Sequence, residues 1–140
     1  MPARNGRYRQ EKRHTMNKIK ISVESLCLEA ELKDTPTAKK ILEILPIEGR
    51  ANVWGEEIYF DIPLEMELET DAGKEVEVGD LGYWPAGPAF CIFFGPTPVS
   101  TDNRPRAFSP VNIFGHVIDD AKQFKTVSSG AKVRITAADG

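Results

Sequence analysis

The segment 79–100, GDLGYWPAGPAFCIFFGPTPVS, constrains the fold of this chain more than any other. Two prolines flank a glycine within 85–88, so a loop separates two extended pieces, 80–84 and 89–94. The second piece is almost wholly apolar, as expected of a strand that is covered on both faces. It runs into the GPTP sequence at 95–98, where the prolines cannot donate to a strand ladder. The segment therefore predicts a central hairpin in a closed β structure.

Further short strands are predicted on both sides of this hairpin, because apolar and polar residues alternate there. They are 18–33, read as two strands with a break near Glu24 and Ser25; 47–60, read as two strands about a turn at Gly55; 111–118; and 131–137. No internal repeat is evident. The predicted fold is mainly β, a closed barrel of about eight strands.

Two short helical segments are predicted to cap this barrel. Thr35 is a candidate N-cap and Pro36 occupies the first helical position. An apolar stripe at helical spacing follows and ends at Pro46, which cannot continue a helix. Residues 119–124 predict one further helical turn.

The region 56–80 is strongly acidic, with ten Asp and Glu residues against Lys74 alone. Glutamates alternate with apolar residues on both sides of a turn at 71–73, which predicts an acidic outer face on two strands. A calcium site needs carboxylates that converge on one point, as in a DxDxDG loop, and the sequence has none. We therefore predict no metal and no cofactor.

The charge of the chain is divided unevenly. Residues 1–15 carry five basic side chains and one acid, a balance of +4, so residues 16–140 must carry −7 for the whole chain to reach −3. An acidic body argues against nucleic acid as a partner. No apolar run is long enough for a membrane span and no secretory signal is visible, so a cytoplasmic protein is expected. We predict a disordered basic tail or an expression remnant at 1–15, and one domain at 16–140.

The sequence offers little for catalysis. His14 lies in the basic tail and His116 on a predicted strand, and no GxSxG elbow, P-loop or GxGxxG is present. Cys27 and Cys91 belong to no metal-binding pattern, which favours reduced, buried thiols. The apolar setting of Cys91, AFCIFF, is expected to raise the pKa of its thiol and to leave it a core residue.

Binding is better supported than catalysis, because aromatic and polar residues cluster where predicted strands enter loops. Aromatic walls with a few fixed polar groups are typical of ligand pockets. The alternative is that Trp84 and Phe94 only fill one end of the barrel and that the prolines stiffen loops. The predicted groove consists of Arg50, Glu57, Tyr59, Tyr83, Trp84, Phe94, Thr97 and Pro98.

Three stretches resemble cyclophilins. The C-terminal IFGHVIDDAKQF…KVRITAADG is similar to a "VFGKV" strand, a short helix and a final strand ending in "ITIADCG", and DTPTAKKILEILP is similar to the "VPKTAENF" helix. The middle, GDLGYWPAGPAFCIFFGPTP with WGEEIYFDIP, looks like a small prokaryotic cyclophilin-like family of unassigned function. The resemblance covers most of residues 18–139 and implies an eight-stranded barrel capped by helices.

The resemblance does not extend to the prolyl isomerase site. Cyclophilins carry an arginine in an "FHR" strand that stabilises the twisted imide, and nothing within 47–63 matches that motif. Twisting a peptide bond costs about 18–20 kcal/mol, so little isomerase activity is expected without that arginine. We therefore expect a non-catalytic domain that binds a small molecule or a peptide segment, as a monomer or a weak dimer. The alternatives are a divergent prolyl isomerase that uses Arg50 or Arg104, and an interaction subunit of a bacterial amide-hydrolysing complex.

Overall fold

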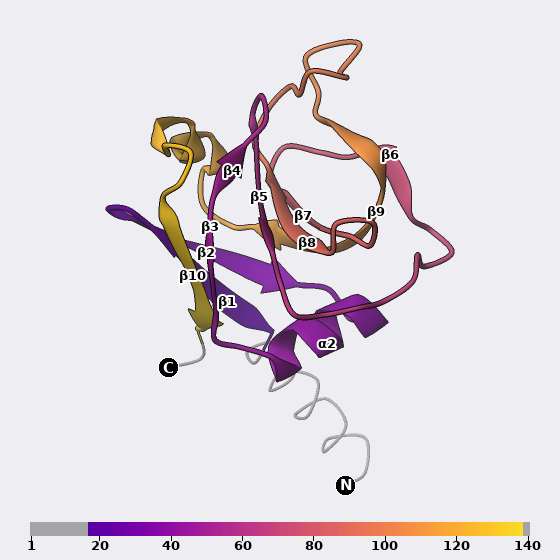
Figure 1. The fold of residues 1–140 in the computed structure, drawn as a ribbon, viewed down its shortest axis with the longest axis vertical. Coiled ribbons are helices and arrows are strands. Elements are labelled where there is room, and N and C mark those ends of the chain that lie inside the picture. The colour runs from indigo at the N-terminus through magenta and orange to yellow at the C-terminus, as the bar shows by residue number, and fades with distance from the viewer. Residues whose placement is uncertain (1–16, 139–140) are drawn as a thin grey trace, which may run out of the picture.

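The computed structural model describes residues 17–138, which form strands wrapped around one main core (Figure 1). The basic tail predicted at 1–15 lies outside the described residues. The elements in chain order are β1 (Lys18–Val23), β2 (Leu26–Leu32), α2 (Pro36–Glu43), β3 (Ile47–Arg50), β4 (Asn52–Val53), β5 (Glu57–Asp61), β6 (Gly73–Glu75), β7 (Asp80–Trp84), β8 (Ala89–Phe93), β9 (Arg106–Val117), the 3₁₀ helix η1 (Ala121–Thr126) and β10 (Lys132–Ala137).

All strand pairs are antiparallel, and the strands follow the order β3-β10-β1-β2-β9-β7-β8-β5-β4, with β6 paired to β9. The mainly β prediction is confirmed. The ladder has ten strands, however, and its end strands β3 and β4 do not pair with each other, so the closed barrel of about eight strands is not confirmed. Only Ala51 separates β3 from β4, and its backbone bonds to the loop before β10 instead. One continuous segment thus forms both edges of the sheet.

Strand β8 is buried on both faces, as its apolar sequence predicts. Phe90 and Ile92 belong to the main core, while Cys91 and Phe93 belong to a second, smaller apolar cluster. Because successive side chains of a strand point to opposite faces, the second cluster lies on the other side of the sheet from the main core. That second face carries the candidate site described below.

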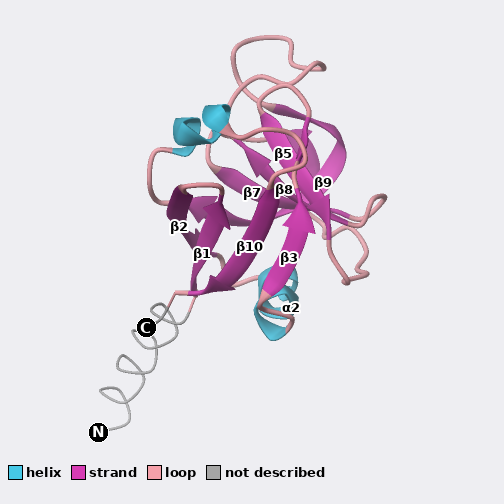
Figure 2. Cartoon of the chain, turned by 60° about the vertical axis from the view of Figure 1, so that its left-hand side comes forward, coloured by secondary structure: helices cyan, strands magenta, loops and turns pink. Residues whose placement is uncertain are grey.

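The two helices lie at opposite ends of the strand assembly (Figure 2). The side chain of Thr35 accepts a hydrogen bond from the Ala38 N–H at 3.1 Å and so caps α2, as predicted. Ala38 of α2 and Phe124 of η1 are buried and close the main core from the two ends. No helix within residues 17–138 is long and apolar enough to cross a membrane.

The acidic region departs from its prediction, because only β6 forms a strand between Pro63 and Val78. A buried side chain on β9, and not a neighbouring strand, makes the hydrogen bonds to the backbone of this region. Asn112 accepts a hydrogen bond from the Glu69 N–H at 2.8 Å, and its amide donates to the Glu67 carbonyl at 3.0 Å. The predicted two-stranded acidic face is therefore wrong for 64–72, where side-chain hydrogen bonds hold an irregular segment.

Candidate functional site

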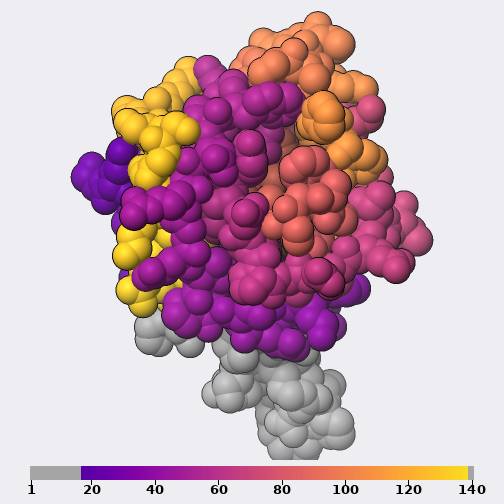
Figure 3. Space-filling model, viewed as in Figure 1, coloured from indigo at the N-terminus to yellow at the C-terminus, as the bar shows by residue number. Residues whose placement is uncertain are grey.

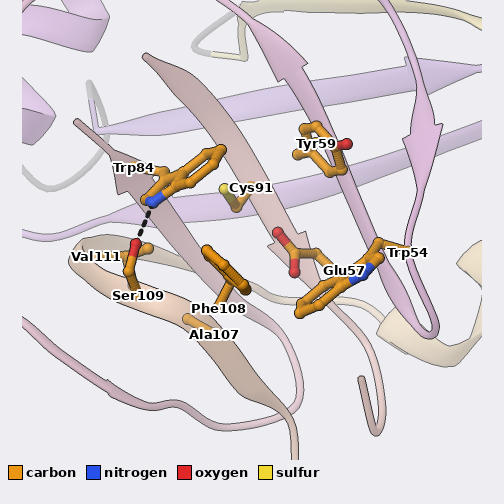
Figure 4. A pocket seen from close by; sticks show the side chains of 9 residues that line it. All are labelled: Trp54, Glu57, Tyr59, Trp84, Cys91, Ala107, Phe108, Ser109 and Val111. Carbon is orange, nitrogen blue, oxygen red and sulfur yellow. Dashed lines mark hydrogen bonds between the residues drawn. The ribbon is translucent and has the colours of Figure 1, made fainter. Parts of the chain in front are cut away.

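A cavity of about 220 Å³ opens on the second face of the sheet, and side chains from β5, β7, β8 and β9 surround it (Figure 4). In the space-filling view the surface is hollowed between the purple segment that carries β4 and β5 and the salmon to orange segments that carry β7 to β9 (Figure 3). The lining residues are Trp54, Glu57, Tyr59, Trp84, Cys91, Ala107, Phe108, Ser109 and Val111.

The register of β5 against β8 directs the side chains of Glu57 and Tyr59 into this cavity. Glu57 lies opposite Phe93, and Tyr59 lies opposite Cys91, so all four side chains share one face of the β5–β8 pair. Figure 4 shows the Glu57 carboxyl pointing toward Cys91. The alternation of β5 and β8 is thus sufficient to place a carboxyl above a thiol.

The floor of the cavity depends on a close approach between β7 and β9 at Gly82. A Cβ atom at this position would lie 3.0 Å from Cγ2 of Val111 and 3.3 Å from the Phe93 ring. A larger residue would therefore push β9 away from the β7–β8 hairpin.

An irregularity in β9 brings neighbouring residues to the same cavity. On β6, Gly73 and Glu75 are two positions apart, but their partners Val111 and Arg106 on β9 are five apart. The extra residues bulge out of the ladder, and bulges re-aim side chains. This explains how the consecutive residues 107–109 all line the cavity, which a regular strand would not allow.

Three aromatic rings form the outer wall. The Phe108 ring lies between the two tryptophans and meets each edge-to-face, with ring centroids 6.1 Å from Trp54 and 6.3 Å from Trp84. The indole N–H of Trp84 donates to the Ser109 hydroxyl, which fixes that ring (Figure 4). Phe108 remains 65% exposed, so the wall is thin on its solvent side.

Trp54 owes its position to the turn between β4 and β5. The Trp54 N–H donates to the Glu57 carbonyl at 2.9 Å, and the Glu57 N–H donates to the Trp54 carbonyl at 3.1 Å. Gly55 adopts φ +59° in this turn, a conformation that favours glycine. The turn predicted at Gly55 therefore also sets one wall of the cavity.

Among the residues that the structure describes, Glu57 is the only acidic side chain that lines the cavity, and it is only 6% exposed. Burial raises the pKa of its carboxyl to about 7, and the hydrogen bond from the Cys91 thiol lowers that pKa only in part. Within residues 17–138 no lysine or arginine forms an ion pair with Glu57. Near neutral pH this carboxyl is thus divided between its acid and its carboxylate form.

Cys91 stays a neutral thiol. Burial raises its pKa well above the ordinary value, and the nearby Glu57 carboxylate raises it further. The expectation of a raised pKa for this cysteine is confirmed. Its contribution to the cavity is a weak donor for the Glu57 carboxyl, not a nucleophile.

Comparison with known proteins places this architecture in a family. The Cyclophilin-like family model matches residues 17–136. The chain belongs to the cyclophilin-like family. The domain is similar to the hypothetical protein AF2241 of Archaeoglobus fulgidus, whose solution structure has 38% identity and a TM-score of 0.77 over 91% of this chain and 98% of that one. It is also similar to McbB, solved in complex with tryptophan, at 16% identity and a TM-score of 0.63 over 85% of this chain and 44% of McbB. No curated protein matches it significantly.

Of the eight residues predicted to form a groove, this cyclophilin-like domain brings Glu57, Tyr59 and Trp84 together. Tyr83 lies on the face of β7 opposite to the cavity and Phe94 directly follows β8, and both are buried in the main core. The Tyr83 hydroxyl donates to the Leu64 carbonyl at 2.6 Å and holds the chain after β5. The alternative that Trp84 and Phe94 fill the interior therefore describes Phe94 but not Trp84, which lines the cavity.

The other three lie outside the cavity for separate reasons. The hydroxyl of the buried Thr97 donates to the Arg106 carbonyl at 2.5 Å. Pro98 packs against the turn at Gly55. Arg50 lies exposed on β3 and donates to the Gly130 carbonyl at 3.2 Å.

Two wall residues were not predicted. Trp54 directly precedes Gly55. The sequence feature that could have indicated it as a wall residue was an indole beside a predicted tight turn. Phe108 falls in a stretch with two prolines that reads as a polar loop, whereas β9 begins at Arg106. The bulge hides the alternation of this strand, so sequence periodicity could not reveal it. Among the described residues, no cluster of His, Cys, Asp or Glu is suited to hold a metal ion.

Proposed function

We propose that this cyclophilin-like domain binds a small organic molecule in the cavity between Trp54, Trp84 and Phe108, and does not transform it. The observation that carries the proposal is an aromatic-walled cavity whose lining includes a buried carboxyl. Apolar walls with few convergent polar groups are the usual composition of a ligand site. At about 220 Å³ the cavity is smaller than the roughly 300–1,000 Å³ of drug-sized pockets, so it suits a compact ligand.

The lining residues support binding without catalysis. Cyclophilins isomerise a prolyl bond with an arginine that stabilises the twisted imide, and among the described residues no arginine, lysine or histidine lines the cavity. Arg50 binds the Gly130 carbonyl, and Arg104 is exposed and paired with Asp102 at 3.4 Å. Neither of the two arginines considered for a divergent isomerase contributes to this site. The likeness to McbB, at 16% identity, concerns the fold alone and does not identify a ligand for this cavity.

Intrinsic fluorescence gives a direct test, because the chain has only two tryptophans and both line the cavity. Screening small apolar and amphiphilic compounds should yield ligands that change tryptophan emission saturably and raise the melting temperature. Phe108→Ala should weaken binding at least about tenfold, since it removes the ring that contacts both tryptophans. Ile118→Ala provides a matched control, because this apolar side chain is 50% exposed outside the cavity.

The proposal fails if no compound in such a screen alters the emission. It also fails if Ile118→Ala weakens binding as much as Phe108→Ala does, because the ligands would then bind elsewhere. A protease-coupled proline-peptide assay with the same protein tests the non-catalytic half, and accelerated isomerisation would contradict it.

A further inference from the structure

Among the described residues, 17–138, the Glu57 carboxyl forms no ion pair with a lysine or arginine. Two charged residues next to lining residues are already paired: Glu56, adjacent to Glu57, with Lys125 at 4.0 Å, and Arg106, adjacent to Ala107, with Glu75. An unpaired buried carboxylate is costly, and proteins normally pair such a group or bind a cation with it. A carboxyl that is 94% buried and aimed into an open cavity therefore points to a positive charge supplied by the ligand.

The aromatic wall favours the same charge. Rings of tryptophan, and less strongly of phenylalanine and tyrosine, attract a cation over their faces, and the attraction grows when the site is dry. Trp54, Trp84, Tyr59 and Phe108 all border the cavity that holds Glu57. A cation here would contact rings on several sides and one carboxylate at the base.

The supply of hydrogen-bond acceptors restricts the type of cation. Besides Glu57, the side-chain oxygens of the lining that can accept are the hydroxyls of Tyr59 and Ser109, and the Ser109 hydroxyl already accepts from the Trp84 indole. A primary ammonium needs acceptors for three N–H donors around one nitrogen, whereas most of this lining is aromatic or aliphatic. A nitrogen that carries alkyl groups needs only the charge and the apolar wall.

We propose, resting on the ligand-binding function above, that the cavity selects a small alkylated organic cation, a tertiary or quaternary ammonium, with the Glu57 carboxylate as its counter-ion. The aromatic rings enclose the alkyl groups, and the carboxylate lies against the charged nitrogen. This assigns a ligand class to the site and a charge-selecting role to one residue.

Affinity should then depend on pH through Glu57. The titratable groups that face it are Cys91 from β8 and Tyr59 from β5, while the lining residues of β7 and β9 carry no ionisable group. The thiol stays neutral because its pKa is raised, and the Glu57 carboxyl has a pKa of about 7. A permanently charged ligand should bind about tenfold more weakly at pH 6 than at pH 8, since protonation of the carboxyl competes with it.

Choline and its uncharged carbon isostere 3,3-dimethylbutan-1-ol provide the probe pair, and tryptophan fluorescence of the full chain provides the readout. Choline should bind at least about tenfold more tightly than the alcohol near pH 8. Glu57→Gln should abolish that preference, whereas Glu56→Gln, which removes the adjacent surface carboxylate, should preserve it. The comparison between pH 6 and pH 8 needs no variant, so it remains decisive even if Glu57→Gln does not fold.

The outcomes separate this inference from the proposed function. Equal binding of choline and the alcohol, or a choline affinity that does not change between pH 6 and pH 8, overturns the cation but leaves a ligand-binding cavity. Failure of both probes, together with the failure of the wider screen, overturns both proposals. Choline binding that survives Glu57→Gln unchanged refutes the counter-ion role.

Discussion

Replacing Glu57 with glutamine should make the domain more stable at alkaline pH and leave its stability almost unchanged at acid pH. In the folded domain the Glu57 carboxyl has a pKa of about 7 against an ordinary value of 4.5, because it is buried. The folded state therefore holds this proton more tightly than the unfolded chain does. The contribution of this group to stability is fully present below about pH 4.5 and is lost as the pH rises through about 7.

The structure sets the size of the effect. The difference between about 7 and 4.5 corresponds to about 3 kcal/mol, since one pH unit is about 1.4 kcal/mol, and about 2.5 kcal/mol of this lies between pH 5 and pH 8. Glutamine matches the shape of the acid and does not ionise. A constant cost of burying the amide would appear equally at both pH values. The quantity to measure is therefore how the difference between the free energies of unfolding of the variant and the wild type changes with pH.

Urea unfolding at pH 5, 6, 7 and 8 measures that difference. The free energy of unfolding of Glu57→Gln minus that of the wild type should rise by about 2.5 kcal/mol from pH 5 to pH 8. Glu56→Gln should give a nearly flat difference, because Glu56 lies in a partly exposed pair with Lys125. A flat curve for Glu57→Gln as well would show that the carboxyl is hydrated in solution, and the argument from burial would be wrong.

Three further outcomes are expected. Asn112→Leu should lower the free energy of unfolding by about 3 kcal/mol in urea titrations, because it removes the partner of the Glu69 N–H and of the Glu67 carbonyl and one of the two hydrogen bonds of the Thr37 hydroxyl. An effect below about 1 kcal/mol would mean that water replaces these bonds. The buried thiol predicted for Cys27 is wrong, because this side chain is exposed, whereas Cys91 is buried. Ellman's reagent should therefore react rapidly with Cys27 of the native protein and slowly with the high-pKa Cys91, so that Cys27→Ser removes the fast phase. In the protease-coupled assay, the proline peptide should isomerise at its uncatalysed rate even at high protein concentration, which a dose-dependent acceleration would contradict.

Local patterns were enough to predict most of the elements of this domain. The hairpin of β7 and β8, the helix that begins after Thr35 and the turn at Gly55 each follow from residues close together in the sequence. Proline, glycine and capping side chains act on their own backbone or on that of the next few residues. The resemblance to cyclophilins added the family, which the family match over 17–136 confirms.

The sequence failed where a distant residue decided the local structure. The glutamates of 64–72 alternate as a strand would, yet Asn112 on β9 satisfies the backbone there and no ladder forms. Tyr83 and Trp84 are adjacent aromatics, but only the sheet determines which of the two faces the main core and which faces the cavity.

The candidate site itself required the tertiary structure. Composition and spacing pointed to Glu57, Tyr59 and Trp84 as site residues, but gave no reason to join them with Cys91 or Phe108. Register across β5 and β8 brings the carboxyl over the thiol, and the bulge in β9 turns Phe108 toward both tryptophans. A side chain's burial, and with it the charge that its neighbours can tolerate, depends on every strand packed around it, so no single stretch of sequence contains that information.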